Sequence, residues 1–166
     1  ISRDAGLFDE PFFLTLSARG EGAELRYTLD GSEPHESSPL YTEPLWIDSR
    51  QGEANTISLN PTNNPQNEGD WFKWRAPRSE ILKVITLKTR TFGGGGSPSP
   101  VMTRTFLNGA ELRGRYDLPI LSLTMDPDQL FDYYDGIYVP GYLFDKANSE
   151  GYSGIDSMHP ANYHVH

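Results

Sequence analysis

The feature that most constrains this sequence is a series of short apolar runs with a period of two. The residues that share one side of an extended chain are Phe12, Leu14, Leu16 and Ala18 in FFLTLSA, and Leu25, Tyr27 and Leu29 in LRYTLD. Alternate side chains of a β-strand point to opposite faces, so each run predicts a strand with one buried face. Such strands cannot bury their apolar faces singly, and the sequence therefore predicts two sheets packed face to face.

A third run, ILKVITLKTRTF, alternates Ile85 and Leu87 with polar residues that include Lys88 and Arg90. It is followed by GGGGSPSP and then by VMTRTFL. Because Gly, Ser and Pro favour turns, the two runs predict a hairpin whose tip is flexible.

These patterns predict which side chains are buried. The residues expected in one core are Leu14, Leu16, Leu25, Tyr27, Leu29, Ile85 and Leu87. The residues expected to face water or the rim of a sheet are Arg26, Lys88 and Arg90.

Glycine and proline punctuate the chain, with 16 Gly and 13 Pro among 166 residues. Short strands separated by such residues are typical of an all-β protein. The sequence thus predicts an immunoglobulin-like or fibronectin-III-like β-sandwich over residues 1–107, interrupted by a polar insertion at residues 48–80.

The charge balance excludes some partners. The formal net charge of −9 opposes binding to nucleic acids and to anionic membrane surfaces. No apolar run approaches the roughly 20 residues that cross a bilayer, so we expect no membrane span. The absence of Cys excludes disulfides and thiolate metal sites. The chain starts at Ile1, and we expect it to be an excised or processed piece of a longer protein.

The pair Asp30-Gly31 predicts a reversal of the chain, because Gly accepts positive φ and Asp bonds to the backbone that follows. An alternative is that Asp30, Ser32 and Glu33 supply oxygen ligands to a calcium ion.

Three short sequence motifs resemble those of a known family. Tyr27-Thr28, the run Asp30 to Pro34 and the run Leu40 to Pro44 resemble the signature of the chitobiase or β-hexosaminidase C-terminal-like domain, also called fibronectin-III-associated. The resemblance implies an immunoglobulin-like sandwich that accompanies extracellular enzymes and has no catalytic residues of its own.

The insertion carries Trp71, Phe72 and Trp74 among polar residues. Trp71 and Trp74 could form a platform for glycan binding, because aromatic faces offer apolar area beside polar groups. The alternative is that these rings close an open end of the sandwich.

The last third changes character. The run Ile120 to Met125 predicts a short strand, and Asp126-Pro127 predicts the start of a short helix that Gly136 ends. An extended segment is expected over Ile137 to Val139.

This region resembles the start of the CotH family, the spore-coat proteins with a kinase-like fold. The matching words are Leu118-Pro119, Asp126-Pro127, Leu130-Phe131 and Gly136 to Val139. The resemblance implies that residues 108–166 are a short α/β fragment of a truncated kinase-like domain. It also implies an extracellular, cell-surface or spore-coat location, with polysaccharide or coat proteins as partners.

The same resemblance implies a parent protein that uses ATP and Mg to phosphorylate serines. No nucleotide lysine or metal-binding aspartate pair maps onto this chain, and the four glycines at 93–96 lack the Lys-Ser/Thr element of a phosphate-binding loop. We therefore expect this fragment to have no catalytic residues and no cofactor.

Two further groups of side chains could bind metals or act as acids. His159, His164 and His166 lie close together near the end of the chain and offer imidazole ligands, although no acidic fourth ligand is near. Asp128, Asp132 and Asp135 share one face at helical spacing, which is typical of a solvated surface. We expect no metal site, with the histidine group as the alternative.

Overall fold

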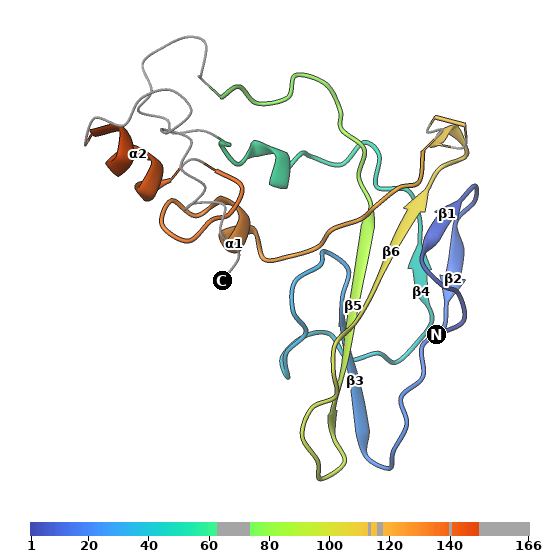
Figure 1. Ribbon diagram of the computed structural model, residues 1–166. Coiled ribbons are helices and arrows are strands. Elements are labelled where there is room, and N and C mark those ends of the chain that lie inside the picture. Colours follow the sequence, from blue (N-terminus) through green and yellow to red (C-terminus); the bar gives the residue numbers. More distant parts are fainter. Residues whose placement is uncertain (63–73, 113, 116–117, 140, 150–166) are drawn as a thin grey trace. The chain divides into compact units, whose positions relative to one another are not determined.

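A computed structural model describes residues 1–62, 74–112, 114–115, 118–139 and 141–149 of the chain (Figure 1). The chain divides into two compact units. The first consists of Ile1–Glu53 and Leu82–Thr124, and the second of Ala54–Ile81 and Met125–His166.

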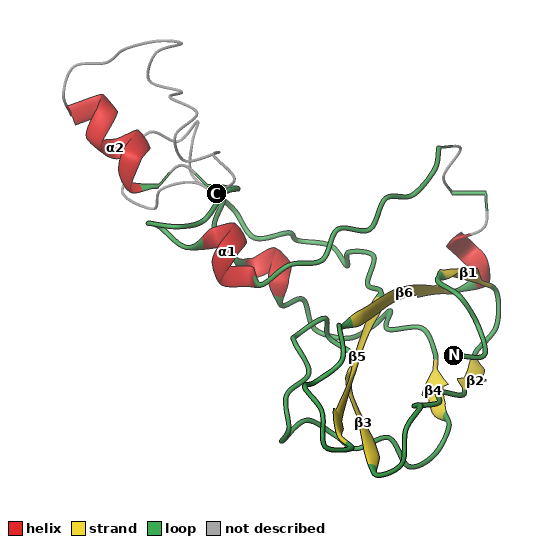
Figure 2. Cartoon of the chain, turned by 60° about the horizontal axis from the view of Figure 1, so that its bottom comes forward, coloured by secondary structure: helices red, strands yellow, loops and turns green. Residues whose placement is uncertain are grey.

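The first unit contains two β-sheets (Figure 2). The strands are β1 (Gly6–Phe8), β2 (Phe12–Leu14), β3 (Ala23–Thr28), β4 (Leu45–Ile47), β5 (Ile85–Gly93) and β6 (Met102–Asn108). One sheet has the strand order β1-β6-β5-β3, and the other pairs β2 with β4. A short 3-10 helix, η2 (Ala110–Leu112), follows β6.

The strand pairing confirms the predicted hairpin, because β5 and β6 are antiparallel neighbours. Strands β3 and β5 are also antiparallel, as are β2 and β4. By contrast, β1 runs parallel to β6, with Gly6 opposite Phe106. The buried side-chain amide of Asn108 donates to the carbonyl oxygens of Glu10 and Ile47, at 3.1 and 3.3 Å, and so joins the end of β6 to the turn between β1 and β2 and to β4 of the other sheet.

The core lies between the two sheets. Its buried members are Phe12, Leu14, Leu16, Leu45, Ile47, Ile85, Leu87 and Phe106. The half-buried side chains that pack against them include Leu25, Tyr27 and Leu29. The predicted side of each strand is therefore confirmed, with β3 at the margin of the core. The protein has an all-β, sandwich-like fold.

The prediction that Lys88 faces water is wrong. Its side chain is buried and forms an ion pair with Glu33, while Arg26 and Arg90 are half-buried. Residues 85–89 of β5 are all buried, so both faces of this strand are covered.

The cover on the outer face of β5 comes from two distant segments. A methyl group placed on Gly31 would lie 3.4 Å from Thr86 Cβ and 3.0 Å from Thr124 Cγ2. In the same layer, the hydroxyls of Thr105 and Ser122 are 3.0 Å apart. The loop after β3 and the segment that ends at Thr124 therefore exclude water from this face.

The second unit contains η1 (Ile57–Leu59), α1 (Pro127–Phe131) and α2 (Tyr142–Ser149). The predicted helix start is confirmed, because Asp126 Oδ1 accepts a hydrogen bond from Asp128 N at 2.9 Å. The predicted end at Gly136 is wrong. Helix α1 ends at Phe131 because Asp132 adopts an extended conformation, and its side chain accepts hydrogen bonds from Tyr134 N and Asp135 N.

Two predicted extended segments are not regular strands. Residues 120–125 form no ladder. Residues 137–139 form bends instead, because Ile137 N and Tyr138 N donate back to the carbonyls of Gln129 and Leu130 at 3.0 and 2.9 Å. Within the described ranges, no helix has the length and apolar character required to span a bilayer.

Candidate functional site

A cavity of about 670 Å³ opens on the first unit where β3 ends, β4 passes and β5 begins. Its lining residues are Thr28, Leu29, Asp30, Ser32, His35, Ser37, Ser38, Pro39, Trp46, Asp48, Ser49, Arg50, Glu53 and Ile85. Cavities of roughly 300–1,000 Å³ are usual for small-molecule sites. We name this cavity the Trp46 pocket.

The aromatic wall of the pocket is Trp46, whose position follows from the pleat of β4. Its neighbours Leu45 and Ile47 point into the core, so Trp46 points outward and stays 50% exposed. Phe13 is its partner on β2 and is 65% exposed. The two rings lie 4.7 Å apart between centroids at an angle of 56°. Two strands thus present an aromatic pair to solvent.

Asp48 lies beside this pair. One carboxylate oxygen accepts a hydrogen bond from Trp46 Nε1 at 3.3 Å, and the other accepts from Ser49 N at 2.6 Å. These contacts orient the indole and the carboxylate relative to each other.

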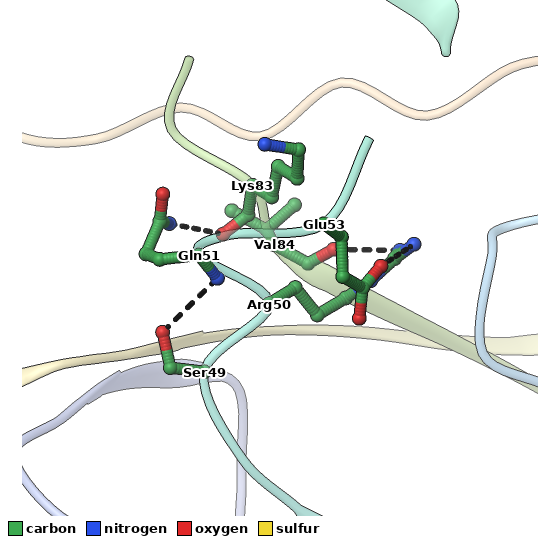
Figure 3. Close-up of polar contacts among 6 residues, drawn as sticks. All are labelled: Ser49, Arg50, Gln51, Glu53, Lys83 and Val84. Atoms are coloured by element: carbon green, nitrogen blue, oxygen red, sulfur yellow. Dashed lines mark hydrogen bonds and ion pairs between the residues drawn. The ribbon is translucent and has the colours of Figure 1, made fainter. Parts of the chain in front are cut away.

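The loop after β4 is fastened to the residues that precede β5 (Figure 3). Arg50 donates to Glu53 at 2.8 Å through Nε and to the carbonyl of Val84 at 3.4 Å through Nη1. Gln51 Nε2 donates to the carbonyl of Lys83 at 3.3 Å. The hydrogen bond from Arg50 holds the pKa of the Glu53 carboxyl below its ordinary value. The polar wall is therefore held in place before any ligand arrives.

Another part of the pocket lining comes from the turn after β3. Asp30 Oδ1 accepts from both the amide and the hydroxyl of Ser32, at 3.0 and 2.6 Å. The hydroxyl bond is the main cause that lowers the pKa of Asp30. Gly31 follows with a φ of 87°, so the predicted chain reversal is confirmed.

The calcium alternative is not supported. Asp30 accepts hydrogen bonds from Ser32, and the Glu33 carboxylate pairs with Lys88 on the outer face of β5. In the described part of the chain, no three His, Cys, Asp or Glu side chains gather in a way that could hold a metal ion.

The pocket also contains a serine and a histidine in contact. Ser37 Oγ lies 2.7 Å from His35 Nδ1, and His35 N donates to Ser38 Oγ at 3.0 Å. Both contacts close a local turn. A catalytic base also needs a third group that orients it. Among the described residues, no carboxylate accepts a hydrogen bond from the His35 ring. We therefore interpret the Ser37–His35 contact as part of a turn and not as a nucleophile with its base.

The sites predicted from sequence lie elsewhere. Trp74 is half-buried, and Trp71 falls outside the described residues. His159, His164 and His166 also fall outside them. The glycan platform and the histidine group therefore stay predictions. Trp46 was missed, although its place between two core residues of a period-two strand is a readable signal of exposure.

Comparison with known proteins identifies a family that part of the chain matches. Residues 14–106 match the family described as Fn3 associated, a non-catalytic type of module. No curated protein and no solved structure matches the chain. The match includes strands β3 to β5 and most of the core, and it spans more than half of the 166 residues. The chain therefore belongs to the Fn3-associated family.

Proposed function

We propose that this chain is the accessory module of a surface protein and supports an attached CotH-like domain. The observation that carries the proposal is the run of exposed apolar side chains after the sandwich. Leu118, Leu121 and Leu123 are 80%, 81% and 85% exposed, and Ile120 is 49% exposed.

The sandwich does not need these side chains for its own core. The core cluster is complete without them, and Phe106 and Leu107 in β6 are already buried. Contiguous exposed apolar residues mark a contact surface more often than a free one. The segment begins with Leu118-Pro119 and continues into Asp126-Pro127, the words that resemble the start of a CotH domain. We therefore assign the cover of this run to that domain.

In this proposal the accessory module and the attached domain have different roles. The family is non-catalytic, and the accessory module would fix the position of its neighbour at an extracellular, cell-surface or spore-coat location. Any phosphoryl transfer would belong to the attached domain, which would supply the groups that bind ATP and Mg. Coat proteins would be the substrates in that arrangement.

The test uses a protein in which this chain is followed by the CotH-like domain. We expect Leu121→Asp with Leu123→Asp to lower the melting temperature of the attached domain, because a charged side chain would be buried at the contact. Differential scanning calorimetry resolves the two domains. The matched control is Ile57→Asp, since Ile57 is apolar and 54% exposed but lies outside the run. Equal effects from both variants, or none from the pair, would reject the proposal.

The 166-residue chain provides a second test. Titration calorimetry with Mg and ATP should show no saturable heat, because no nucleotide cradle maps onto it. Micromolar binding that depends on Mg would place catalytic groups in this chain and overturn the division of work.

Carbohydrate binding is a second candidate function. It gains no support from Trp74, which is less exposed than Trp46. Trp46 is 50% exposed and favours carbohydrate binding at a different place, the Trp46 pocket.

A further inference from the structure

The Trp46 pocket combines features that small-molecule sites share and that a plain sandwich edge lacks. Trp46 is 50% exposed although its neighbours in β4 are buried, and Phe13 beside it is 65% exposed. The contact of an aromatic pair with water is unfavourable in free energy, and an apolar surface that covers the pair makes a favourable contribution. The Trp46 backbone is fixed in β4 and its Nε1 is hydrogen-bonded to Asp48, so the indole face is pre-organised for a flat partner.

The excess of carboxylates in the pocket lining restricts the class of ligand that can bind there. Asp30, Asp48 and Glu53 bring three carboxylates to the lining, against one guanidinium from Arg50. Glu53 already pairs with Arg50 at 2.7 Å. An anionic ligand would meet unneutralised carboxylates, whereas a ligand rich in hydroxyl groups would donate hydrogen bonds to them.

The polar groups stand next to the aromatic group rather than apart from it. Asp48 is hydrogen-bonded to the indole of Trp46, and Ser49 N fixes its other oxygen. A ligand that stacks on the indole would therefore present its edge to a carboxylate. Sugars have this shape, with an apolar face of C–H groups and a rim of hydroxyls.

The polar wall does not have to reorganise. Arg50 and Gln51 hold the loop after β4 against the carbonyls of Val84 and Lys83 (Figure 3). A fixed wall reduces the ordering cost of binding.

From this geometry we propose that the Trp46 pocket binds a neutral saccharide chain, with one ring stacked on Trp46 and its hydroxyls bonded to Asp48. This inference goes beyond the accessory role and does not depend on the identity of any attached domain.

The test is a calorimetric titration of the 166-residue chain with three neutral oligosaccharides, namely cellohexaose, hexa-N-acetylchitohexaose and mannohexaose. Hexagalacturonate is the anionic comparison. We expect saturable binding of at least one neutral probe and at least tenfold weaker binding of the anionic one. Failure of all three neutral probes, or equal binding of the acidic probe, would overturn the proposal.

Variants locate the site. Trp46→Ala should weaken binding at least tenfold, and Trp46→Phe should restore part of it because a ring remains. Asp48→Asn should weaken binding several-fold, since the amide keeps one acceptor and loses the charge. Melting temperatures would show that each variant is folded.

The matched control is Tyr134→Ala, which removes an aromatic side chain of the second unit that is 67% exposed. It should leave saccharide affinity unchanged. A loss with Tyr134→Ala and none with Trp46→Ala would refute the site. Failure here would leave the attached-domain proposal intact, because that proposal is tested by calorimetry of a different protein.

Discussion

Strands β2 and β5 both belong to runs with an apolar residue at every second position, and they differ in the structure. In β2, Phe12 and Leu14 are buried and Phe13 is exposed. In β5, five successive residues from Ile85 to Thr89 are buried. The period of two therefore separates a buried face from an exposed face in β2, although the exposed Phe13 is itself apolar, and it does not do so in β5.

The difference arises from what lies on the outer faces. The outer face of β2 carries the Phe13–Trp46 pair and meets solvent. The outer face of β5 is covered by the loop after β3, through Glu33 and Gly31, and by Ser122 in the layer over Thr105. A polar residue in a strand thus predicts a polar partner, and here the partner of the buried Lys88 is the carboxylate of the exposed Glu33 rather than water alone.

The largest expected effect concerns the inner face of β5. Leu87→Ala removes a fully buried side chain and should lower the free energy of unfolding by about 2–5 kcal/mol. Phe13→Ala, at the exposed position of β2, should cost about 1 kcal/mol or less. Urea unfolding followed by circular dichroism measures both. Similar losses would mean that the two positions do not differ as described.

The next effect tests the outer face of β5. Glu33→Ala leaves the buried ammonium of Lys88 without its partner and should cost about 1–3 kcal/mol. Lys88→Met removes the charge and keeps the aliphatic stem, so it should change the free energy of unfolding by less than about 1 kcal/mol. The same urea titration compares them. If Lys88→Met were the more damaging variant, the outer face would not be a covered environment.

A smaller effect tests the loop that forms this cover. Gly31→Ala combines a φ of 87° with a methyl group 3.0 Å from Thr124 Cγ2, whereas Gly22→Ala has a φ of 68° and no neighbour within 4 Å. The positive φ alone should cost about 1–2 kcal/mol in both. Gly31→Ala should cost more, because Thr124 must also shift. Thermal unfolding measures the loss of stability in both variants. Equal losses would argue against tight contact between Gly31 and Thr124 over β5.

The smallest effect is a pH dependence at the same loop. The hydroxyl of Ser32 lowers the pKa of Asp30 from an ordinary value of 3.8, so the folded state binds this proton less readily than the unfolded state. The stabilisation is therefore complete above that value and is lost as the pH falls through it towards the folded pKa. Solvent screening keeps the effect below about 1 kcal/mol.

The variant Asp30→Asn isolates this contribution. The difference in unfolding free energy between wild type and variant should be largest near pH 6 and should vanish near pH 2, as measured by urea unfolding at several pH values. A difference that grows as the pH falls would have the wrong sign for a lowered pKa.

Local patterns predicted the parts of the fold that depend on neighbours in sequence. The period of two placed Leu14 and Leu87 correctly, and the Asp126-Pro127 pair marked the start of α1. The burial of Lys88 could not be predicted, because its cover comes from segments far along the chain. The strand expected at 120–125 fails for a related reason, since no described strand pairs with it.

The candidate site was less predictable than the fold. Trp71 and Trp74 attracted attention because they lie in a polar insertion, while Trp46 lies inside a strand. Its pocket is assembled from the turn after β3, from β4 with the loop that follows, and from Ile85. The pairing of β3 with β5 and the packing of the two sheets against each other bring these segments together.

The parallel pairing of β1 with β6 has a consequence for how the protein folds. Gly6 must find Phe106, and this contact cannot form on the ribosome until the 100 residues that follow Gly6, up to and including Phe106, have been synthesised. Sheets dominated by such distant pairings fold in roughly milliseconds to seconds, because the chain entropy is lost before the contact forms. During that interval β1 has no partner strand, whereas β2 can already pair with β4. Strand β1 is therefore the strand of the sandwich that waits longest for its partner.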